Sequence, residues 1–312
     1  MLTMSLIFVF IVCGVASKRT LVVGHRGNGC SQPGCESAIP ENTVESYLSA
    51  IEMGADVIEI DVWLSADNEI VITHRDKWAD NERLYPSIVT MNNDTIPTPS
   101  DYSHRDRSRF PVKAAWSRDR PDPNMYLSQQ YSTPHTPLTT IPLLREALQA
   151  VCPTGKKLVV ELKADREDIG RLVMTEIEKY ASFDCIHAIS SFYWSKHQVL
   201  GGYHFDLLKP LKDDPRVKRA LLIQVPHPDG VTSFIKAAKY YNASYLHPSC
   251  RMMNRWTEAM MQEVHQAGLE VMCYFGSQSM DKEADFVKAI NKGVDEICTN
   301  SPKRLRNLID KL

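Results

Sequence analysis

The stretch VIEIDV, residues 57–62, alternates apolar and acidic side chains. Such alternation predicts a β-strand, in which side chains two apart share a face. Glu59 and Asp61 therefore share one face of this strand, and Ile60 lies on the other. The apolar face suits a covering layer of helices, so both carboxylates are predicted to point away from that layer, into the interior of the fold.

Similar runs recur along the chain and alternate with segments in which apolar residues have helical spacing. Strands that alternate with helices pair in parallel through right-handed crossovers. Eight such strands predict an α/β fold, a closed (β/α)8 TIM barrel, which commonly uses about 250 residues in one domain. Asn42 and Thr43 are expected to cap the first helix and Gly54 to end it. The strand runs are 20–24, 57–62, 158–162, 186–190, 220–224, 244–247, 270–274 and 296–298, and the helical segments include 43–53, 141–151, 169–180, 231–241 and 257–266.

One further run, residues 70–74, follows the strand at 57–62 too closely to allow a crossover helix. A parallel connection needs a dozen or more residues, so this run is predicted to fold back antiparallel as a hairpin. With the turn centred on Asp67 and Asn68, register counting places His74 opposite Asp61. The hairpin would return His74 to the mouth of the barrel.

Between about residues 77 and 140 the alternation lapses, and the sequence is rich in Pro, Asp, Ser and Arg. A stretch of this length without regular structure inside a compact domain is usually functional or disordered. We interpret it as an insertion over the C-terminal mouth of the barrel. Two interpretations stay open, a solvated loop and a lid that guides phosphate or contacts lipid. Its basic and aromatic residues are Arg105, Arg107, Arg109, Lys113, Arg118, Arg120, Tyr102, Phe110 and Trp116.

The amino-terminal residues predict export. An apolar run at 6–15 is followed by Ala16 and Ser17, which is the pattern of a secretory signal peptide over residues 1–17. The run is shorter than the ~20 residues that span a bilayer. Residues 18–312 would then form one secreted or lumenal TIM-barrel domain, and Asn93 and Asn242 fit the N-glycosylation pattern.

The chain has eight cysteines, of which one lies in the predicted signal peptide. Cys30 and Cys35 bracket a short turn, and an oxidising compartment favours a local disulfide between them. Zinc is the rival interpretation, but no second close pair completes such a site. The others are expected to be small buried hydrophobes, with at least one free thiol because the count is odd. These are Cys152, Cys185, Cys250, Cys273 and Cys298.

The ends of the predicted strands carry the polar residues that suggest chemistry. In a TIM barrel the active site lies at these ends. Three carboxylates aimed into one mouth repel one another unless they are protonated or bind a cation, and oxygen ligands favour Mg²⁺ or Ca²⁺. Two histidines could serve as acid and base, while an arginine and a lysine attract phosphate oxygens. The carboxylates are Glu59, Asp61 and Glu161, the histidines His25 and His74, and the cations Arg26 and Lys163.

Several blocks of sequence resemble the glycerophosphodiester phosphodiesterases, from Leu21 to the end outside the insertion. These blocks are GHRG at 24–27, PENT at 40–43, GAD at 54–56 leading to EID at 59–61, IVITH at 70–74, IPL at 141–143, VELK at 160–163, HQAGL at 265–269 and GVD at 293–295.

The resemblance implies a role for each strand-end residue. It implies that Glu59, Asp61 and Glu161 hold one divalent cation, that His25 and His74 are the acid–base pair, and that Arg26 and Lys163 contact phosphate. Glu41 would support Arg26 or the metal shell, or act only in capping. Three departures concern Arg75 after the second histidine, the CYF run at 273–275, and Asn300 where the family usually has Asp.

The resemblance implies hydrolysis of a glycerophosphodiester, such as glycerophosphocholine or glycerophosphoethanolamine, to glycerol phosphate and an alcohol. A phospholipase D-like enzyme acting on lysophospholipids or sphingomyelin is the alternative, with peripheral membrane contact through the insertion. A secreted protein that binds phosphodiesters without catalysis is less favoured, because all the catalytic residue types are present. A formal net charge of -2, from 36 basic and 38 acidic residues, gives no indication of nucleic-acid binding.

Overall fold

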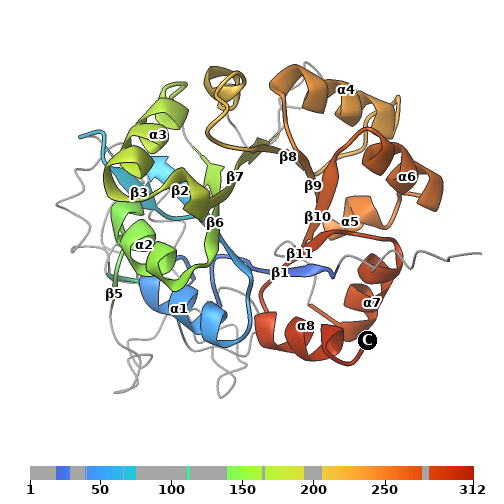
Figure 1. The fold of residues 1–312 in the computed structure, drawn as a ribbon, viewed down its shortest axis with the longest axis horizontal. Helices are drawn as coiled ribbons and strands as arrows, with labels where there is room; N and C mark the ends of the chain where they lie inside the picture. Colours follow the sequence, from blue (N-terminus) through green and yellow to red (C-terminus); the bar gives the residue numbers. More distant parts are fainter. Residues whose placement is uncertain are drawn as a thin grey trace, which may run out of the picture.

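The computed structural model describes residues 19–28, 39, 41–65, 67–74, 111–112, 139–163, 166–192, 206–275 and 281–312, with 111–112 and 139–140 described by backbone alone. Eight parallel strands form a ring that β1 and β2 close by pairing with each other (Figure 1). The predicted (β/α)8 barrel is thereby confirmed. The strands of the ring are β1 (Leu21–Gly24), β2 (Val57–Leu64), β6 (Lys157–Leu162), β7 (Ile186–Phe192), β8 (Arg219–Ile223), β9 (Tyr245–Pro248), β10 (Glu270–Tyr274) and β11 (Glu296–Thr299).

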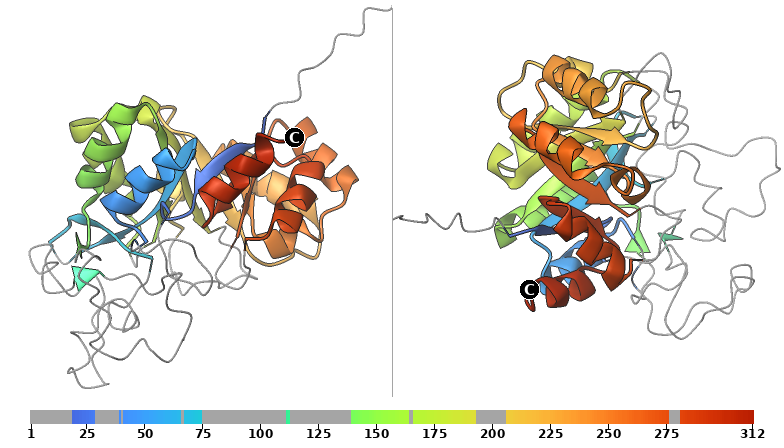
Figure 2. Two further views of the ribbon diagram at one scale, coloured as in Figure 1. Left: turned by 90° about the horizontal axis from the view of Figure 1, so that it is seen from below. Right: turned by 90° about the vertical axis from the view of Figure 1, so that its right-hand side faces the viewer.

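Helices surround the ring on its outer side (Figure 1). Between β7 and β8 the described residues contain only a 3-10 turn, η8 (Lys209–Leu211). The two-residue strands β4 (Pro111–Val112) and β5 (Thr139–Thr140) pair outside the ring, at one end of it (Figure 2). The helices are α1 (Val44–Glu52), α2 (Leu144–Val151), α3 (Ile169–Tyr180), α4 (Val231–Tyr241), α5 (Cys250–Met253), α6 (Glu258–Gln266), α7 (Glu283–Asn291) and α8 (Pro302–Ile309), with 3-10 turns η6 (Cys152–Thr154) and η7 (Phe183–Cys185).

The two faces of each strand pack against different layers. On β2, Ile58 and Ile60 are fully buried in the large core between the ring and the helices. Val57 belongs instead to a small core inside the ring, with Val159 and Met272. Burial of one such aliphatic side chain stabilises the fold by about 1.5–3 kcal/mol. The alternation confirms that Glu59 and Asp61, which share the face of Val57, lie in the interior of the barrel.

Helix α1 begins at a cap that differs from the prediction in one residue. Thr43 is the cap, since its hydroxyl accepts from the backbone N–H of Ser46 at 3.2 Å. Asn42 is not a cap: its backbone lies in the left-handed region, at φ 55°, and its side chain points to Asp61. The prediction treated Asn42 and Thr43 as equivalent because both types cap helices well.

The hairpin partner β3 (Ile70–Ile72) runs antiparallel to β2, as predicted, but with a register shifted by one residue. Val62 pairs with Ile72, so Asp61 lies opposite Thr73 rather than His74. The shift arises at the turn, where the N–H of Asn68 donates to the carbonyl of Ser65 and Asn68 adopts φ 63°. Such a left-handed residue is typical of three-residue loops, whereas the counting assumed a two-residue turn.

A disulfide joins Cys152 to Cys185, with their Cα atoms 5.5 Å apart. Both had been expected to be small buried hydrophobes, with their pairing left open, so the bond is a finding that the sequence did not predict. They are 33 residues apart in sequence, but each lies shortly before one of the neighbouring strands β6 and β7, which pair in parallel. Cys250, Cys273 and Cys298 are free and buried. The predicted Cys30–Cys35 pair lies outside the described residues.

Several predictions fall outside the described residues or stay untested. The signal peptide, Asn93 and nearly all of the insertion belong to the first group. Asn242 is described: it ends α4 in a left-handed conformation and is exposed, as a glycan acceptor must be. Within the described part of the chain, no helix combines the length and apolar character that crossing a membrane requires.

Candidate active site

The predicted site residues come together at one side of the barrel mouth. His25 and Arg26 directly follow β1, Glu59 and Asp61 lie on β2, and His74 follows β3. On the next strand, β6, Glu161 is the last residue but one, and Lys163 follows the strand. Glu41 approaches from the loop before α1. The antiparallel return of β3 explains how His74 reaches the site although β3 is not a strand of the ring.

Arg26 connects two of the acidic residues. Its backbone adopts φ 55°, and its N–H donates to Glu59 Oε2 at 2.9 Å. One terminal nitrogen of its guanidinium donates to both oxygens of Glu41, at 2.9 and 3.0 Å. Its Nε lies 3.3 Å from Asp61 Oδ2. Glu41 thus contacts Arg26, one of the two positions that the sequence left open for it.

The three predicted metal ligands form a compact cluster. Glu59, Asp61 and Glu161 each offer an oxygen, and these oxygens lie within 4.8 Å of one another. The ammonium group of Lys163 lies against Glu161 and 3.3 Å from Asp61 Oδ1. Asp61 Oδ2 accepts from the side-chain amide of Asn42 at 2.9 Å.

Burial changes the proton affinity of these carboxyl groups. Burial, with the charges of Asp61 and Glu161 nearby, raises the pKa of Glu59 well above its usual value. Burial likewise raises the pKa of Glu161, against the opposing effect of Lys163. Burial also acts to raise the pKa of Asp61, but Lys163, His74 and Arg26 outweigh it and the pKa is lowered. Crowded carboxylates of this kind favour a bound cation.

Two buried oxygens in the cluster fit a metal ion. Glu59 Oε1 and Asp61 Oδ1 have no hydrogen-bond partner among the described residues. An unsatisfied buried carboxylate oxygen costs free energy, which a cation would recover. A site made of three carboxylates suits a hard ion such as Mg²⁺ or Ca²⁺. The donor set therefore fits the predicted cofactor.

The two histidines lie in contrasting surroundings. His25 is buried, and its Nδ1 lies 2.8 Å from Asn300 Oδ1, while His74 is partly buried. With the amide oxygen turned to the ring, Nδ1 carries the proton and Nε2 keeps its lone pair. Burial and the nearby charge of Arg26 lower the pKa of His25 to about 3. The same two causes lower the pKa of His74 well below its usual value.

Sequence reasoning missed three residues that support the site. Asn42 binds Asp61, and Asn300 binds His25. Asp281 holds the end of β11, because its Oδ2 accepts from the Thr299 hydroxyl at 2.7 Å and from the N–H of Asn300. The sequence carried one signal, since Asn300 replaces an Asp that the resembled family usually has. Nothing in the sequence pointed to Asp281.

The opposite side of the mouth has different chemistry. Lys163 Nζ lies 5.5 Å from the centre of the Phe192 ring. His247 is buried, and burial lowers its pKa to about 3, so it is neutral. Tyr274 lies among the apolar residues at the interior, and burial raises the pKa of its hydroxyl above its usual value. The described residues that face inward nearest the mouth on this side include Ser190, Phe192, Leu222, His247 and Tyr274.

The chain matches known proteins over most of its length. Residues 25–304 match the model of the glycerophosphoryl diester phosphodiesterase family. A glycerophosphodiester phosphodiesterase of Caldanaerobacter subterraneus subsp. tengcongensis is 24% identical over 94% of this chain and 99% of its own.

Solved structures share the fold. The Oleispira antarctica phosphodiesterase, in complex with the product sn-glycerol-3-phosphate, has a TM-score of 0.65 and 19% identity, covering 94% of this chain and 97% of that one. The glycerophosphodiester phosphodiesterase of Thermotoga maritima has a TM-score of 0.61 and 18% identity, covering 93% and 98%. At these identities the likeness concerns the fold.

Proposed function

The chain belongs to the glycerophosphoryl diester phosphodiesterase family, and from that premise we propose that it hydrolyses glycerophosphodiesters in a metal-dependent reaction. The products would be glycerol phosphate and an alcohol, with glycerophosphocholine and glycerophosphoethanolamine as candidate substrates. One observation carries the proposal: two buried carboxylate oxygens, one on Glu59 and one on Asp61, accept no hydrogen bond from the described residues and lie in one cluster with Glu161. A structural cluster of charges would have no reason to leave them unsatisfied.

Glu59, Asp61 and Glu161 would hold the cation, Mg²⁺ or Ca²⁺. When bound, a divalent ion stabilises charge on phosphoryl oxygens and makes a coordinated hydroxyl group or water more acidic. Asn42 would fix the orientation of Asp61 through its 2.9 Å hydrogen bond. Such outer hydrogen bonds commonly contribute about 10–100-fold to metal affinity or activity.

His25 and His74 would move the protons of the reaction. One removes a proton from the nucleophile, either water or the neighbouring hydroxyl of the substrate, and the other protonates the leaving alkoxide. Asn300 would position His25 by accepting from Nδ1, so that Nε2 is the nitrogen that acts. Lowered pKa values keep both rings neutral in the structure, so a proton must reach one of them before it acts as acid.

Arg26 and Lys163 would contact the phosphate oxygens. Arg26 is held in place by Glu41, which fixes a side chain that would otherwise have many rotamers. Lys163 lies between Asp61 and Glu161, so its charge compensates the same carboxylates that would bind the cation. Competition between the ion and Lys163 for these oxygens would free the ammonium group for phosphate.

The test is release of choline from glycerophosphocholine and of ethanolamine from glycerophosphoethanolamine, first with Mg²⁺ or Ca²⁺ and then with a chelator. We expect release with metal, together with an equal amount of glycerol phosphate, and loss of release with chelator. Release of phosphocholine instead would place the cleavage on the other side of phosphorus. Release that is unaffected by chelator would contradict the metal-dependent proposal.

A second candidate is phospholipase D-like cleavage of lysophospholipids or sphingomyelin. The observation that favours it is the basic and aromatic composition of the insertion at about 77–140. This candidate would include peripheral membrane contact through the insertion. Activity on lysophosphatidylcholine micelles, with none on either water-soluble substrate, would select it.

Secretion and its modifications form part of the proposal. The apolar run at 6–15 and the Cys152–Cys185 disulfide both suit an oxidising compartment. We expect cleavage after residue 17, a Cys30–Cys35 bond, and glycans on Asn93 and Asn242. Mass spectrometry of the protein from a eukaryotic culture medium, before and after enzymatic removal of N-glycans, tests all of these.

A further inference from the structure

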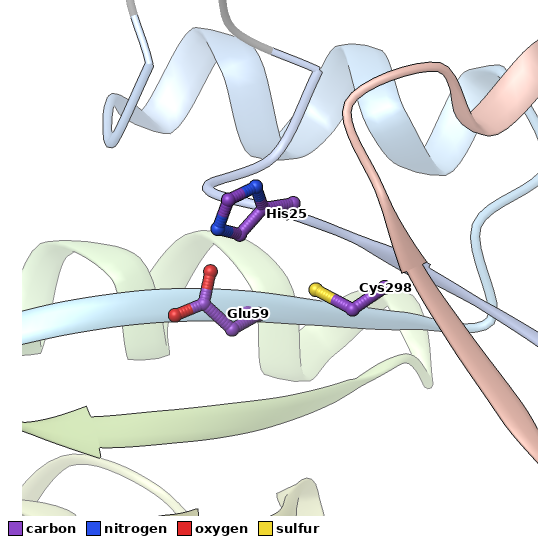
Figure 3. Close-up of side chains that lie close together, drawn as sticks. All are labelled: His25, Glu59 and Cys298. Carbon is purple, nitrogen blue, oxygen red and sulfur yellow. The ribbon is translucent and has the colours of Figure 1, made fainter. Parts of the chain in front are cut away.

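A second cluster of potential metal ligands lies beside the three carboxylates. A nitrogen of His25, an oxygen of Glu59 and the sulfur of Cys298 lie within 4.8 Å of one another (Figure 3). They come from β1, β2 and β11, which are neighbours in the ring. All three residues are buried, so the cluster lies in the interior of the barrel.

Each of the three side chains has an atom that is free to bind. His25 uses Nδ1 for Asn300, which leaves Nε2, and Figure 3 shows one ring nitrogen turned toward Glu59. Glu59 uses Oε2 for Arg26, and its Oε1 is a buried oxygen without a partner among the described residues. Cys298 is a free thiol. The proposed hydrolysis gives Cys298 no task, although the sulfur lies beside two residues of that reaction.

We propose that His25, Glu59 and Cys298 form a second cation site, selective for a thiophilic divalent ion of the zinc class. Zinc binds imidazole nitrogen, carboxylate oxygen and thiolate sulfur, and many zinc sites have three protein ligands with water in the fourth position. The ligand atoms of tetrahedral zinc are about 3.3–3.7 Å apart, given bonds of about 2.0–2.3 Å. Atoms now within 4.8 Å of one another would need to close by about 1 Å, which side-chain rotation can supply.

Binding of the ion at this site needs no oxidant, reductant or other co-reactant. The S–H bond of Cys298 breaks, a sulfur–metal bond forms, and the proton passes to solvent. The thiolate and the Glu59 carboxylate then neutralise the two positive charges of the ion. A neutral centre costs less to bury than a charged one. Mg²⁺ and Ca²⁺ avoid sulfur, so they would stay with Glu59, Asp61 and Glu161.

The two sites cannot act independently, because they share residues. Glu59 belongs to both, and His25 is one of the proposed acid–base pair. Zinc bound to His25 Nε2 takes the lone pair that the reaction would use. This consequence rests on the proposed function, and it makes the second site inhibitory.

Direct metal binding tests the site without relying on turnover. Protein stripped of metal is titrated with Co²⁺ or Cd²⁺ in the presence of excess Mg²⁺, and sulfur-to-metal charge-transfer absorption is recorded. We expect one equivalent to bind with this absorption in the wild type, and none of the absorption in Cys298→Ser. Cys273→Ser is the matched control, since Cys273 is also buried but lies in the core outside the ring.

Absence of the absorption in the wild type, or its survival in Cys298→Ser, would overturn the proposal. Loss in Cys273→Ser instead would assign the ion to another thiol and would also overturn it. Cys298→Val preserves apolar packing with Val23 and Val57, and replaces the serine variant if that one does not fold.

Zinc inhibition of the hydrolysis provides a second measurement. Loss of an outer partner of a metal ligand costs about 10–100-fold in affinity, so loss of the thiolate ligand should raise the half-inhibitory zinc concentration by more than about 30-fold. Cys298→Ser should keep the rate measured without zinc. Equal inhibition of both proteins would contradict the inference, whereas no hydrolysis by either would contradict only the proposed function, because metal absorption still decides the second site.

Discussion

The two halves of the barrel mouth differ sharply in charge. In the half formed by β1, β2 and β6, six ionisable side chains lie close together and contact one another through ion pairs and hydrogen bonds. In the other half, the described inward-facing residues near the C-terminal ends of β7 to β10 carry no charge at neutral pH. The charged half comprises Arg26, Glu41, Glu59, Asp61, Glu161 and Lys163, and the neutral half Ser190, Phe192, Leu222, His247 and Tyr274.

This difference shows how a ring of similar strands can separate the binding of charged groups from the binding of an uncharged part of a ligand. Buried charges must be paired or bind an ion, so they gather where each can serve as a partner of another. The neutral half needs no such pairing and is free to match the shape of a substrate. We infer that the metal and phosphate lie against the charged half, and the organic part of the substrate against the neutral half.

The largest effect is expected from removing one ligand charge. Glu161→Gln should lower kcat by about a thousand-fold or more, because three ligands leave little redundancy in binding the ion. The matched control is Ser190→Ala, since Ser190 pairs with Glu161 on the neighbouring strand but belongs to the neutral half. Its rate should stay within about threefold of the wild type. Steady-state kinetics with glycerophosphocholine at several Mg²⁺ concentrations would show whether the halves differ as inferred.

The histidines come next, and the leaving group can separate their tasks. His25→Ala and His74→Ala should each lower kcat by about 10²–10⁴-fold on glycerophosphocholine. A p-nitrophenyl phosphodiester has a leaving group that needs no proton, so the variant that lacks the acid should regain most of its rate on it. The variant that lacks the base should stay slow. Equal behaviour of the two variants on both substrates would rule out separate acid and base roles.

Asn300→Asp should shift the pH dependence of kcat/KM. A carboxylate beside Nδ1 of His25 stabilises the protonated ring, so the pKa of His25 should rise. The limb of the kcat/KM pH profile that belongs to His25 should therefore shift to higher pH. Asn300→Ala should lower the rate without such a shift, and an unchanged profile in Asn300→Asp would exclude a positioning role for Asn300.

The smallest effect is expected in the neutral half. Tyr274→Phe removes a buried hydroxyl and leaves the ring, so KM should change by about three- to tenfold while kcat changes little. Comparison of choline and ethanolamine substrates would show whether this half distinguishes head groups. If Tyr274→Phe lost as much kcat as Glu161→Gln, the inference that the two halves have different tasks would be contradicted.

The sequence was informative where a local pattern decides the structure. Alternation of Glu59, Ile60 and Asp61 was enough to place the carboxylates inside the barrel, because strand geometry has a period of two. The hairpin register failed by one residue, because it depends on the conformation of Asn68 rather than on residue type. Contacts between residues far apart in the sequence were harder still to predict.

Contacts that bring together distant parts of the chain left few signals in the sequence. Asn300 meets His25 across 275 residues, and Cys152 meets Cys185 only because β6 and β7 are neighbours. Asn42 was predicted to cap the helix because asparagine occupies such caps as readily as the threonine at position 43 does. Its actual contact with Asp61 depends on the left-handed backbone at Asn42 and on the position of β2 beside β1, which its residue type does not reveal.

The Cys152–Cys185 bond also determines how the chain would respond to mechanical force. It encloses β6 and α3, a full β/α unit that carries Glu161 and Lys163. A chain pulled from its ends would extend around this covalent ring, and the 33-residue separation would withhold about 110 Å of contour length. Two residues of the proposed site would therefore remain inside a closed loop after the rest of the barrel had been drawn out.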